Sequence, residues 1–135
     1  MKMVVFDWDG TLTPQRSSAL VSKRRGFLTG VLEKLQELRA AGVLLAVATN
    51  QHPDMSLELI RERIAWLQGL FRFDAVLFAQ TPERRKPQPA MLLEIAERFG
   101  VSPDQTLFVG DAETDRQAAE AAGCRFCWAE EFLGR

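Results

Sequence analysis

Acidic residues whose spacing suits phosphoryl transfer follow the first apolar run of the chain. This run, Met3 to Phe6, leads into the segment Asp7-Trp8-Asp9-Gly10-Thr11. A carboxylate can attack phosphorus and form a covalent aspartyl phosphate when nearby groups screen both negative charges. The first carboxylate after the run, Asp7, is therefore the predicted nucleophile.

Polar residues also follow three later apolar runs, and their types fit the same chemistry. The runs are Val43 to Ala48, Ala75 to Ala79 and Thr106 to Val109. The residues behind them are Thr49 and Asn50, then, past a loop, Arg85 and Lys86, and finally Gly110, Asp111 and Asp115. Because ligands of parallel sheets bind beyond the carboxyl ends of the strands, we expect these residues to converge at one edge.

The converging carboxylates predict a metal site. A hard divalent cation prefers oxygen ligands and would screen the charge on the nucleophile and on the phosphate. Asp7 and Asp111 could each supply one carboxylate oxygen, and the backbone carbonyl of Asp9 could supply a third. The predicted metal ligands are therefore Asp7, Asp9 and Asp111.

The remaining residues after the first run suit proton transfer and close approach to phosphate. Asp9 is the predicted general acid, which would protonate the leaving oxygen and afterwards act as the base that activates water. Gly10 lets the backbone approach the phosphate closely, and Thr11 can fix the loop.

Residues of the later segments suit phosphate binding. The Thr49 hydroxyl and the Asn50 backbone N–H can bind phosphate oxygens. Lys86 supplies positive charge where negative charge spreads over these oxygens. Asp115 is a predicted supporting residue, which could orient Lys86 or a metal-bound water.

The apolar runs are nearly continuous, which is typical of parallel strands buried on both faces. A fifth, weaker run spans Cys124 to Trp128. Helical patterns lie between the runs, with stripes at Val31, Leu32, Leu35 and Leu38, at Leu57, Ile60, Ile64 and Leu67, at Leu92, Ile95, Ala96 and Phe99, and along 113–122. Thr29 and Ser56 are the predicted N-caps of the first two. This alternation predicts a three-layer α/β fold in one domain, residues 1–135.

Composition sets the broad class. The 135 residues carry a formal net charge of −1 and 47% hydrophobic residues, an ordinary globular balance. This charge provides no global field for nucleic acid or anionic lipid. No apolar run is long enough to span a bilayer, the N-terminus lacks the pattern of a signal peptide, and two cysteines frame no disulfide scaffold, so we expect a cytoplasmic protein.

The ordered motifs resemble those of the haloacid dehalogenase superfamily of phosphohydrolases. They are Asp7-x-Asp9-Gly10-Thr11, Thr49-Asn50, Lys86 and Gly110-Asp111-x-x-Thr114-Asp115. The resemblance implies Mg²⁺ as cofactor and a Rossmann-like core with sheet order 3-2-1-4-5. It also implies that residues 12 to 28 form the squiggle and flap that follow the first motif.

Motif spacing and local sequence narrow the resemblance. Asp9 and Thr49 lie 40 positions apart and Thr49 and Lys86 lie 37 apart, which leaves no room for an inserted cap domain. The sequences of residues 47–51 and 85–91 resemble those of the capless branch, which holds histidinol-phosphate, heptose-bisphosphate and polynucleotide 3′-phosphatases. Within this resemblance, Arg85 matches an arginine that the branch uses to bind the substrate phosphate. Residues 78–85 contain no Cys or His, so the zinc loop of the first two groups is absent, and Trp8 replaces their usual arginine.

These observations predict a magnesium-dependent phosphomonoesterase acting on a phosphorylated small molecule. A polynucleotide 3′-phosphatase is the alternative, because the basic run Lys23-Arg24-Arg25 could clamp a nucleic-acid backbone. A phosphate-binding module without catalysis, and a homo-oligomer, also remain open. Cys124 and Cys127 are expected to be buried strand residues on opposite faces of the sheet.

Overall fold

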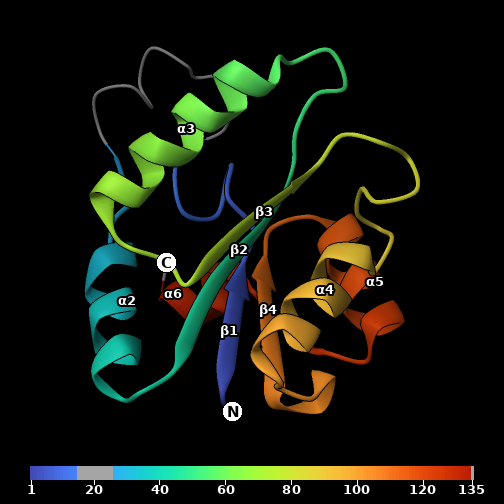
Figure 1. Cartoon of the computed structure of the whole chain (residues 1–135). Coiled ribbons are helices and arrows are strands. Elements are labelled where there is room, and N and C mark those ends of the chain that lie inside the picture. Colours follow the sequence, from blue (N-terminus) through green and yellow to red (C-terminus); the bar gives the residue numbers. More distant parts are fainter. Residues whose placement is uncertain (15–25, 135) are drawn as a thin grey trace.

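The computed structural model describes residues 1–14 and 26–134 of the chain. Five parallel strands form one sheet in the order β3-β2-β1-β4-β5. Their bounds are Met3–Phe6 (β1), Leu44–Asn50 (β2), Ala75–Ala79 (β3), Thr106–Gly110 (β4) and Arg125–Trp128 (β5). The predicted α/β class and strand order are confirmed, with β1 at the centre of the sheet (Figure 1).

The register of the central strands explains why the motifs meet. Phe6, the last residue of β1, pairs with Val47 of β2 and with Val109 of β4. The backbone N–H of Asp7 then donates to the carbonyl oxygen of Val109 at 2.9 Å. β4 ends one residue beyond the level of Phe6 and β2 three residues beyond it. The motif residues at these strand ends therefore lie at the same edge of the sheet.

Helices cover both faces of the sheet, and the bounds are Val31–Ala40 (α2), Leu57–Leu70 (α3), Ala90–Phe99 (α4), Glu113–Ala122 (α5) and Ala129–Leu133 (α6). A short 3₁₀ helix, Pro103–Gln105, precedes β4. Figure 1 shows α4 and α5 on one side of the sheet and α2 and α3 on the other. The predicted three layers are present.

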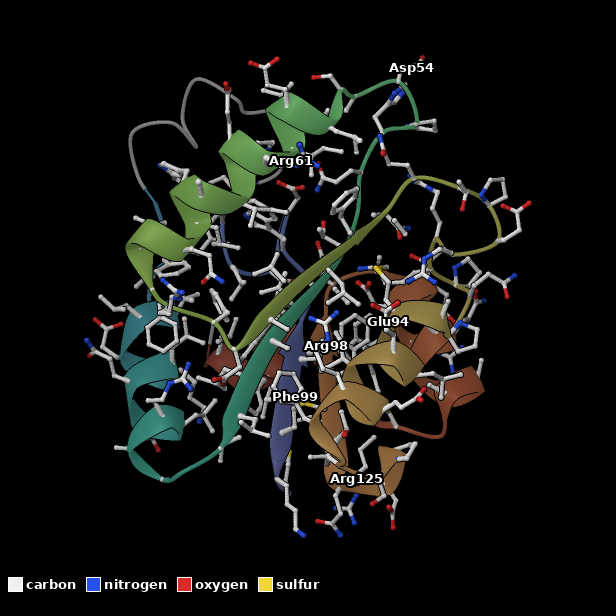
Figure 2. All side chains as sticks on the ribbon, viewed as in Figure 1. Asp54, Arg61, Glu94, Arg98, Phe99 and Arg125 are labelled. Carbon is white, nitrogen blue, oxygen red and sulfur yellow. The ribbon has the colours of Figure 1, made fainter. Side chains whose placement is uncertain are left out.

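Alternate residues of the strands feed two apolar clusters, one on each face. Met3, Val5 and Phe108 pack on the side of α4 and α5, whereas Val4 and Phe6 pack on the side of α2 and α6. Figure 2 shows how side chains fill the space between the sheet and the helices. Burial on both faces is the physical reason that the strands read as continuous apolar runs.

The helix ends correct two details of the sequence analysis. Ser56 caps α3 as predicted, because its Oγ accepts from the N–H of Leu59 at 3.1 Å. The prediction for Thr29 is wrong, since α2 is capped by Gly30 at a φ of 85° without a side-chain hydrogen bond. Leu32 and Leu57, which were expected on the inner stripes, are 38% and 52% exposed because the buried faces are narrower than the periodicity suggests.

The two cysteines lie near opposite faces, although neither is fully buried. Cys124 precedes β5 and packs on the α4 side, whereas Cys127 lies within β5 and packs on the α6 side. Both are half-buried free thiols, and burial raises the pKa of Cys124 to about 11. Over residues 1–14 and 26–134, no helix combines the length and the apolar character that crossing a bilayer requires.

Candidate active site

A buried ammonium group shared by two carboxylates forms the centre of the site. The Nζ of Lys86 lies 2.8 Å from the Oδ1 of Asp7 and 2.8 Å from the Oδ1 of Asp115. It also donates to the carbonyl oxygen of Ala48 at 2.9 Å. Asp7, Lys86 and Asp115 are all buried, so these contacts are largely shielded from water. Asp7 directly follows β1, Lys86 lies in the loop after β3, and Asp115 lies in the first turn of α5.

The charges in this cluster do not balance, and the pKa directions reflect the imbalance. Burial raises the pKa of Asp7, and the negative charge of Asp111 adds to this effect, while Lys86 opposes it. Burial likewise raises the pKa of Asp115, against the attraction of Lys86. Burial alone would lower the pKa of Lys86, but the carboxylates of Asp7 and Asp115 raise it. The buried cluster therefore carries an excess of negative charge that a cation would relieve.

Asp7 and Asp111 are the carboxylates best placed to hold that cation. Asp7, Asp111 and Asp115 each offer an oxygen within 4.8 Å of the others. Both oxygens of Asp115 are already used, because Oδ1 contacts Lys86 and Oδ2 accepts from the N–H groups of Asp111 and Ala112 at 3.2 and 3.0 Å. A set of hard oxygen donors with excess negative charge fits Mg²⁺ better than a soft transition metal.

The loop after β1 is a tight turn that carries Gly10 and Thr11. Gly10 has a φ of 85°, a conformation that favours glycine, and its N–H donates to the carbonyl oxygen of Thr13 at 2.7 Å. The Oγ1 of Thr11 donates to the Oδ2 of Asp7 at 3.3 Å. This hydrogen bond links the turn to the carboxylate of Asp7.

The end of β2 is tied to the lysine loop by side-chain hydrogen bonds. The amide of Asn50 donates to the carbonyl of Lys86 at 3.1 Å and accepts from the N–H of Lys86 at 2.9 Å. The guanidinium of Arg85 donates to the carbonyl oxygen of Gln51 at 2.6 Å. Both residues therefore fix the loop that presents the lysine, a role for the Asn50 side chain that the sequence analysis missed.

Thr49 and Asp9 are linked through two residues that the sequence analysis did not assign to the site. The Nε2 of Gln51 donates to the Oγ1 of Thr49 at 2.9 Å, and its Oε1 accepts from Arg63. Arg63 also donates to the Oδ1 of Asp9 at 2.9 Å. No sequence signal marked Arg63, because α3 lies between the second and third motifs and Arg63 belongs to a run of three charged residues.

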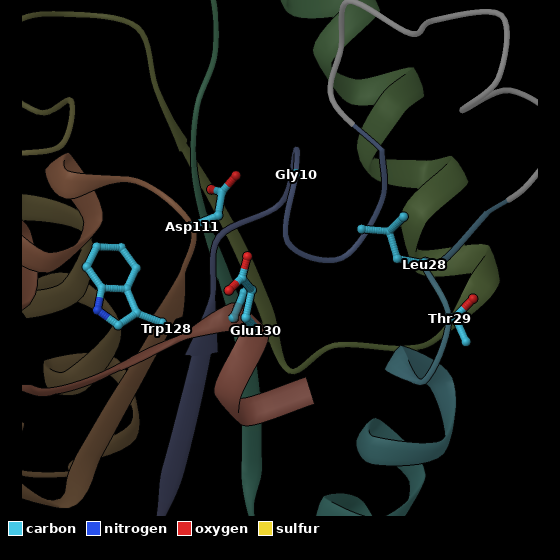
Figure 3. A pocket seen from close by; sticks show the side chains of 7 residues that line it. Gly10, Leu28, Thr29, Asp111, Trp128 and Glu130 are labelled. Atoms are coloured by element: carbon cyan, nitrogen blue, oxygen red, sulfur yellow. The ribbon is translucent and has the colours of Figure 1, made fainter. Parts of the chain in front are cut away.

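A pocket of about 560 Å³ opens beside Asp111 (Figure 3). Gly10 and Asp111 form its wall toward the carboxylate cluster, and Leu28, Thr29, Trp128, Ala129 and Glu130 form the rest. The close-up shows the Glu130 carboxylate on the same side of the pocket as Asp111, with Leu28 and Thr29 opposite. The site is therefore reachable from solvent on the Asp111 side. Most of the expected squiggle and flap (15–25), with Lys23-Arg24-Arg25, falls outside the residues that the structure describes.

The absence of a side chain at Gly110 leaves room for the side chain of Asp115. Substitution of Gly110 therefore tests how tightly Asp115 is packed. A Cβ at Gly110 would lie 2.5 Å from the Oδ2 of Asp115, a distance that real contacts do not reach. We expect Gly110→Ala to displace Asp115 and lower the free energy of unfolding by about 1–3 kcal/mol or more. Chemical denaturation measures this loss.

The matched control for that substitution is Gly69→Ala in α3. A Cβ at Gly69 meets nothing within 4 Å, and Gly69 has no positive φ. Alanine should therefore leave stability unchanged or raise it by up to about 1 kcal/mol. Equal stabilities for the two alanine variants would contradict the tight packing of Asp115 against β4.

Comparisons with known proteins identify the family of the chain. The family model described as haloacid dehalogenase-like hydrolase matches residues 15–129. The chain is 40% identical to a phosphoglycolate phosphatase of Thiobacillus denitrificans over 100 residues, which cover 73% of this chain and 42% of that protein. It is 38% identical to a phosphoglycolate phosphatase of Escherichia coli K12 over 94 residues, covering 70% of this chain and 36% of that protein.

Solved structures share the same core. The D,D-heptose 1,7-bisphosphate phosphatase of B. bronchiseptica, solved with magnesium and phosphate, superposes with a TM-score of 0.73 at 29% identity and covers 93% of this chain and 79% of that one. The chain spans about two fifths of the length of the curated relatives that it matches. The matching family model and these relatives show that the chain belongs to the haloacid dehalogenase-like hydrolases.

Proposed function

We propose that this protein hydrolyses phosphate monoesters with Mg²⁺ as cofactor and Asp7 as nucleophile. The observation that carries the proposal is the buried contact between Asp7 and Lys86, which lies beside the carboxylate of Asp111. A structural ion pair needs only one carboxylate, whereas Asp7, Asp111 and Asp115 place three together here. An excess of negative charge in a buried, hydrogen-bonded cluster is typical of a site that binds a metal and an activated nucleophile.

In the first step, a carboxylate oxygen of Asp7 attacks phosphorus and the bond from phosphorus to the ester oxygen breaks. Asp9 donates its proton to that oxygen, so the alcohol leaves in neutral form. Lys86 and the Thr49 hydroxyl would stabilise the charge on the transferring phosphoryl group. Bound Mg²⁺ would supply further charge neutralisation, held by Asp7, Asp111 and the carbonyl oxygen of Asp9.

In the second step, water attacks the phosphorus of the aspartyl phosphate. Asp9, now ionised, takes the proton of that water, and the bond from phosphorus to the Asp7 oxygen breaks. Inorganic phosphate leaves and both aspartates return to their starting protonation states. Asp115 takes no proton in this scheme, because its two oxygens are occupied in holding Lys86 and the first turn of α5.

We propose a phosphorylated small molecule as substrate. The relatives named phosphoglycolate phosphatase and heptose bisphosphate phosphatase support this class. We also propose a single capless domain, because α3 and β3 already occupy the interval between Thr49 and Lys86. The nucleic-acid alternative depends on Lys23-Arg24-Arg25, for which the described residues supply no supporting observation.

Hydrolysis of p-nitrophenyl phosphate tests the nucleophile. We expect turnover with Mg²⁺, loss of turnover with a chelator, and a fall to background for Asp7→Asn, because an amide does not attack phosphorus. Asp54→Asn, in an exposed turn, should keep full activity, and circular dichroism should show both variants folded. Normal hydrolysis by Asp7→Asn would refute the assignment.

Metal binding without substrate gives an independent test. We expect Mg²⁺ to raise the melting temperature of the wild type and to raise it less in Asp111→Asn, because bound metal stabilises only the folded state. The raised pKa values of Asp7 and Asp115 mean that protons compete with metal at low pH. The Mg²⁺-dependent rise should therefore be smaller near pH ~5 than near pH ~7.5.

The control for metal binding is again Asp54→Asn, which should respond to Mg²⁺ as the wild type does. An equal rise in Asp111→Asn and in the wild type would place the metal elsewhere. A rise that grows toward low pH would contradict the direction of the two carboxyl pKa shifts.

A further inference from the structure

Arg63 extends from α3 and makes three contacts, two with residues of the first motif and one with the residue that follows β2. Its Nη2 lies 2.9 Å from the Oδ1 of Asp9, and its Nη1 donates to the Oε1 of Gln51. The guanidinium carbon lies 4.5 Å from the ring centroid of Trp8. Contacts to three different groups define both the position and the plane of the guanidinium.

This ion pair differs from the surface ion pairs of the protein in its burial. The side chains of Arg63 and Asp9 are 22% and 14% exposed, whereas those of Arg98 and Glu94 on α4 are 52% and 43% exposed. Partly buried charges are screened less by water and salt, so the pair holds its geometry better than an exposed one. Stacking on Trp8 adds a cation–π contact that favours the same arrangement.

The contacts of Arg63 connect the proposed proton donor to the phosphate-binding strand end. From Asp9 the chain of polar contacts runs through Arg63 to Gln51, and from the Nε2 of Gln51 to the hydroxyl of Thr49. A group that transfers a proton in the transition state must be held within hydrogen-bond reach of the reacting oxygen. Arg63 supplies this constraint from outside the four motifs.

We propose that Arg63 is a positioning residue for Asp9, an inference that rests on the hydrolysis proposed above. Arg63 donates to the Oδ1 of Asp9 in both protonation states of that side chain. It thereby holds Asp9 where the carboxylic acid can protonate the leaving oxygen and the carboxylate can then take a proton from water. It does not bind the transferring phosphoryl group. Loss of Arg63 should therefore impair the proton transfers and leave substrate binding and Mg²⁺ binding nearly unchanged.

The leaving group of the substrate separates this role from a purely structural one. Expulsion of an alkoxide requires a proton from Asp9, whereas p-nitrophenolate leaves without one because it is a weak base. The ratio kcat/KM reports only the steps up to transfer onto Asp7, so it isolates the donation of the proton. The comparison uses an alkyl phosphate, such as glycerol phosphate, and p-nitrophenyl phosphate on the same enzyme preparation.

We expect Arg63→Met to lower kcat/KM for the alkyl phosphate by about 10–100-fold and to change that for p-nitrophenyl phosphate by less than about threefold. Arg63→Lys, which keeps the charge, should recover part of the loss. Arg61→Met is the matched control, because Arg61 is exposed on the same helix and is labelled in Figure 2. If Arg63→Met fails to fold, Arg63→Gln carries the same comparison.

A double-mutant cycle makes the assignment specific to Asp9. In an Asp9→Asn background the substitution of Arg63 should have almost no further effect on the alkyl phosphate, since the group that it positions is gone. Equal losses on the two esters, or additive losses in the cycle, would overturn the role of Arg63 while leaving the hydrolase proposal intact. No hydrolysis of either ester by the wild type with Mg²⁺ would overturn both.

Discussion

The buried ammonium group of Lys86 forms ion pairs with two buried carboxylates, and a third carboxylate, that of Asp111, lies beside them. Lys86 satisfies Asp7 and Asp115 with contacts of 2.8 Å and uses its remaining N–H on the carbonyl of Ala48. Burying a charge is costly unless it is paired and hydrogen-bonded, so each group depends on the others. The negative charge that remains is the feature that makes the cluster receptive to a cation.

The sheet supplies the geometry that this cluster needs. Because β1 lies between β2 and β4 and the three strands run parallel, Asp7 is placed beside the ends of both neighbours. The first turn of α5 then adds Asp115, whose Oδ2 accepts two backbone N–H groups at the start of that helix. A carboxylate is favoured there because the N-terminus of a helix carries partial positive charge. Gly110 must be small because the side chain of Asp115 passes directly over it.

The parts of this structure that the sequence predicts are those that repeat or follow a strand. Continuous apolar runs predict β1 to β4 closely, and the ordered motifs predict which residues gather at the sheet edge. Contacts that depend on how a helix packs across the sheet leave no such pattern. Arg63 reaches Asp9 only because α3 lies over the loop after β1, and the Asn50 side chain binds the Lys86 peptide only because two loops meet. The N-cap of α2 likewise depends on the left-handed backbone conformation of Gly30. The presence of Thr29 in the sequence does not predict this conformation.

Rapid acid quench of the enzyme with excess p-nitrophenyl phosphate and Mg²⁺, followed by peptide mass spectrometry, tests the central claim most directly. We expect a phosphoryl group on the peptide that carries Asp7 and none on the same peptide of Asp7→Asn. Turnover with a phosphoryl group on a different residue would contradict that claim. So would a burst in which p-nitrophenol exceeds free phosphate while the Asp7 peptide carries no phosphoryl group.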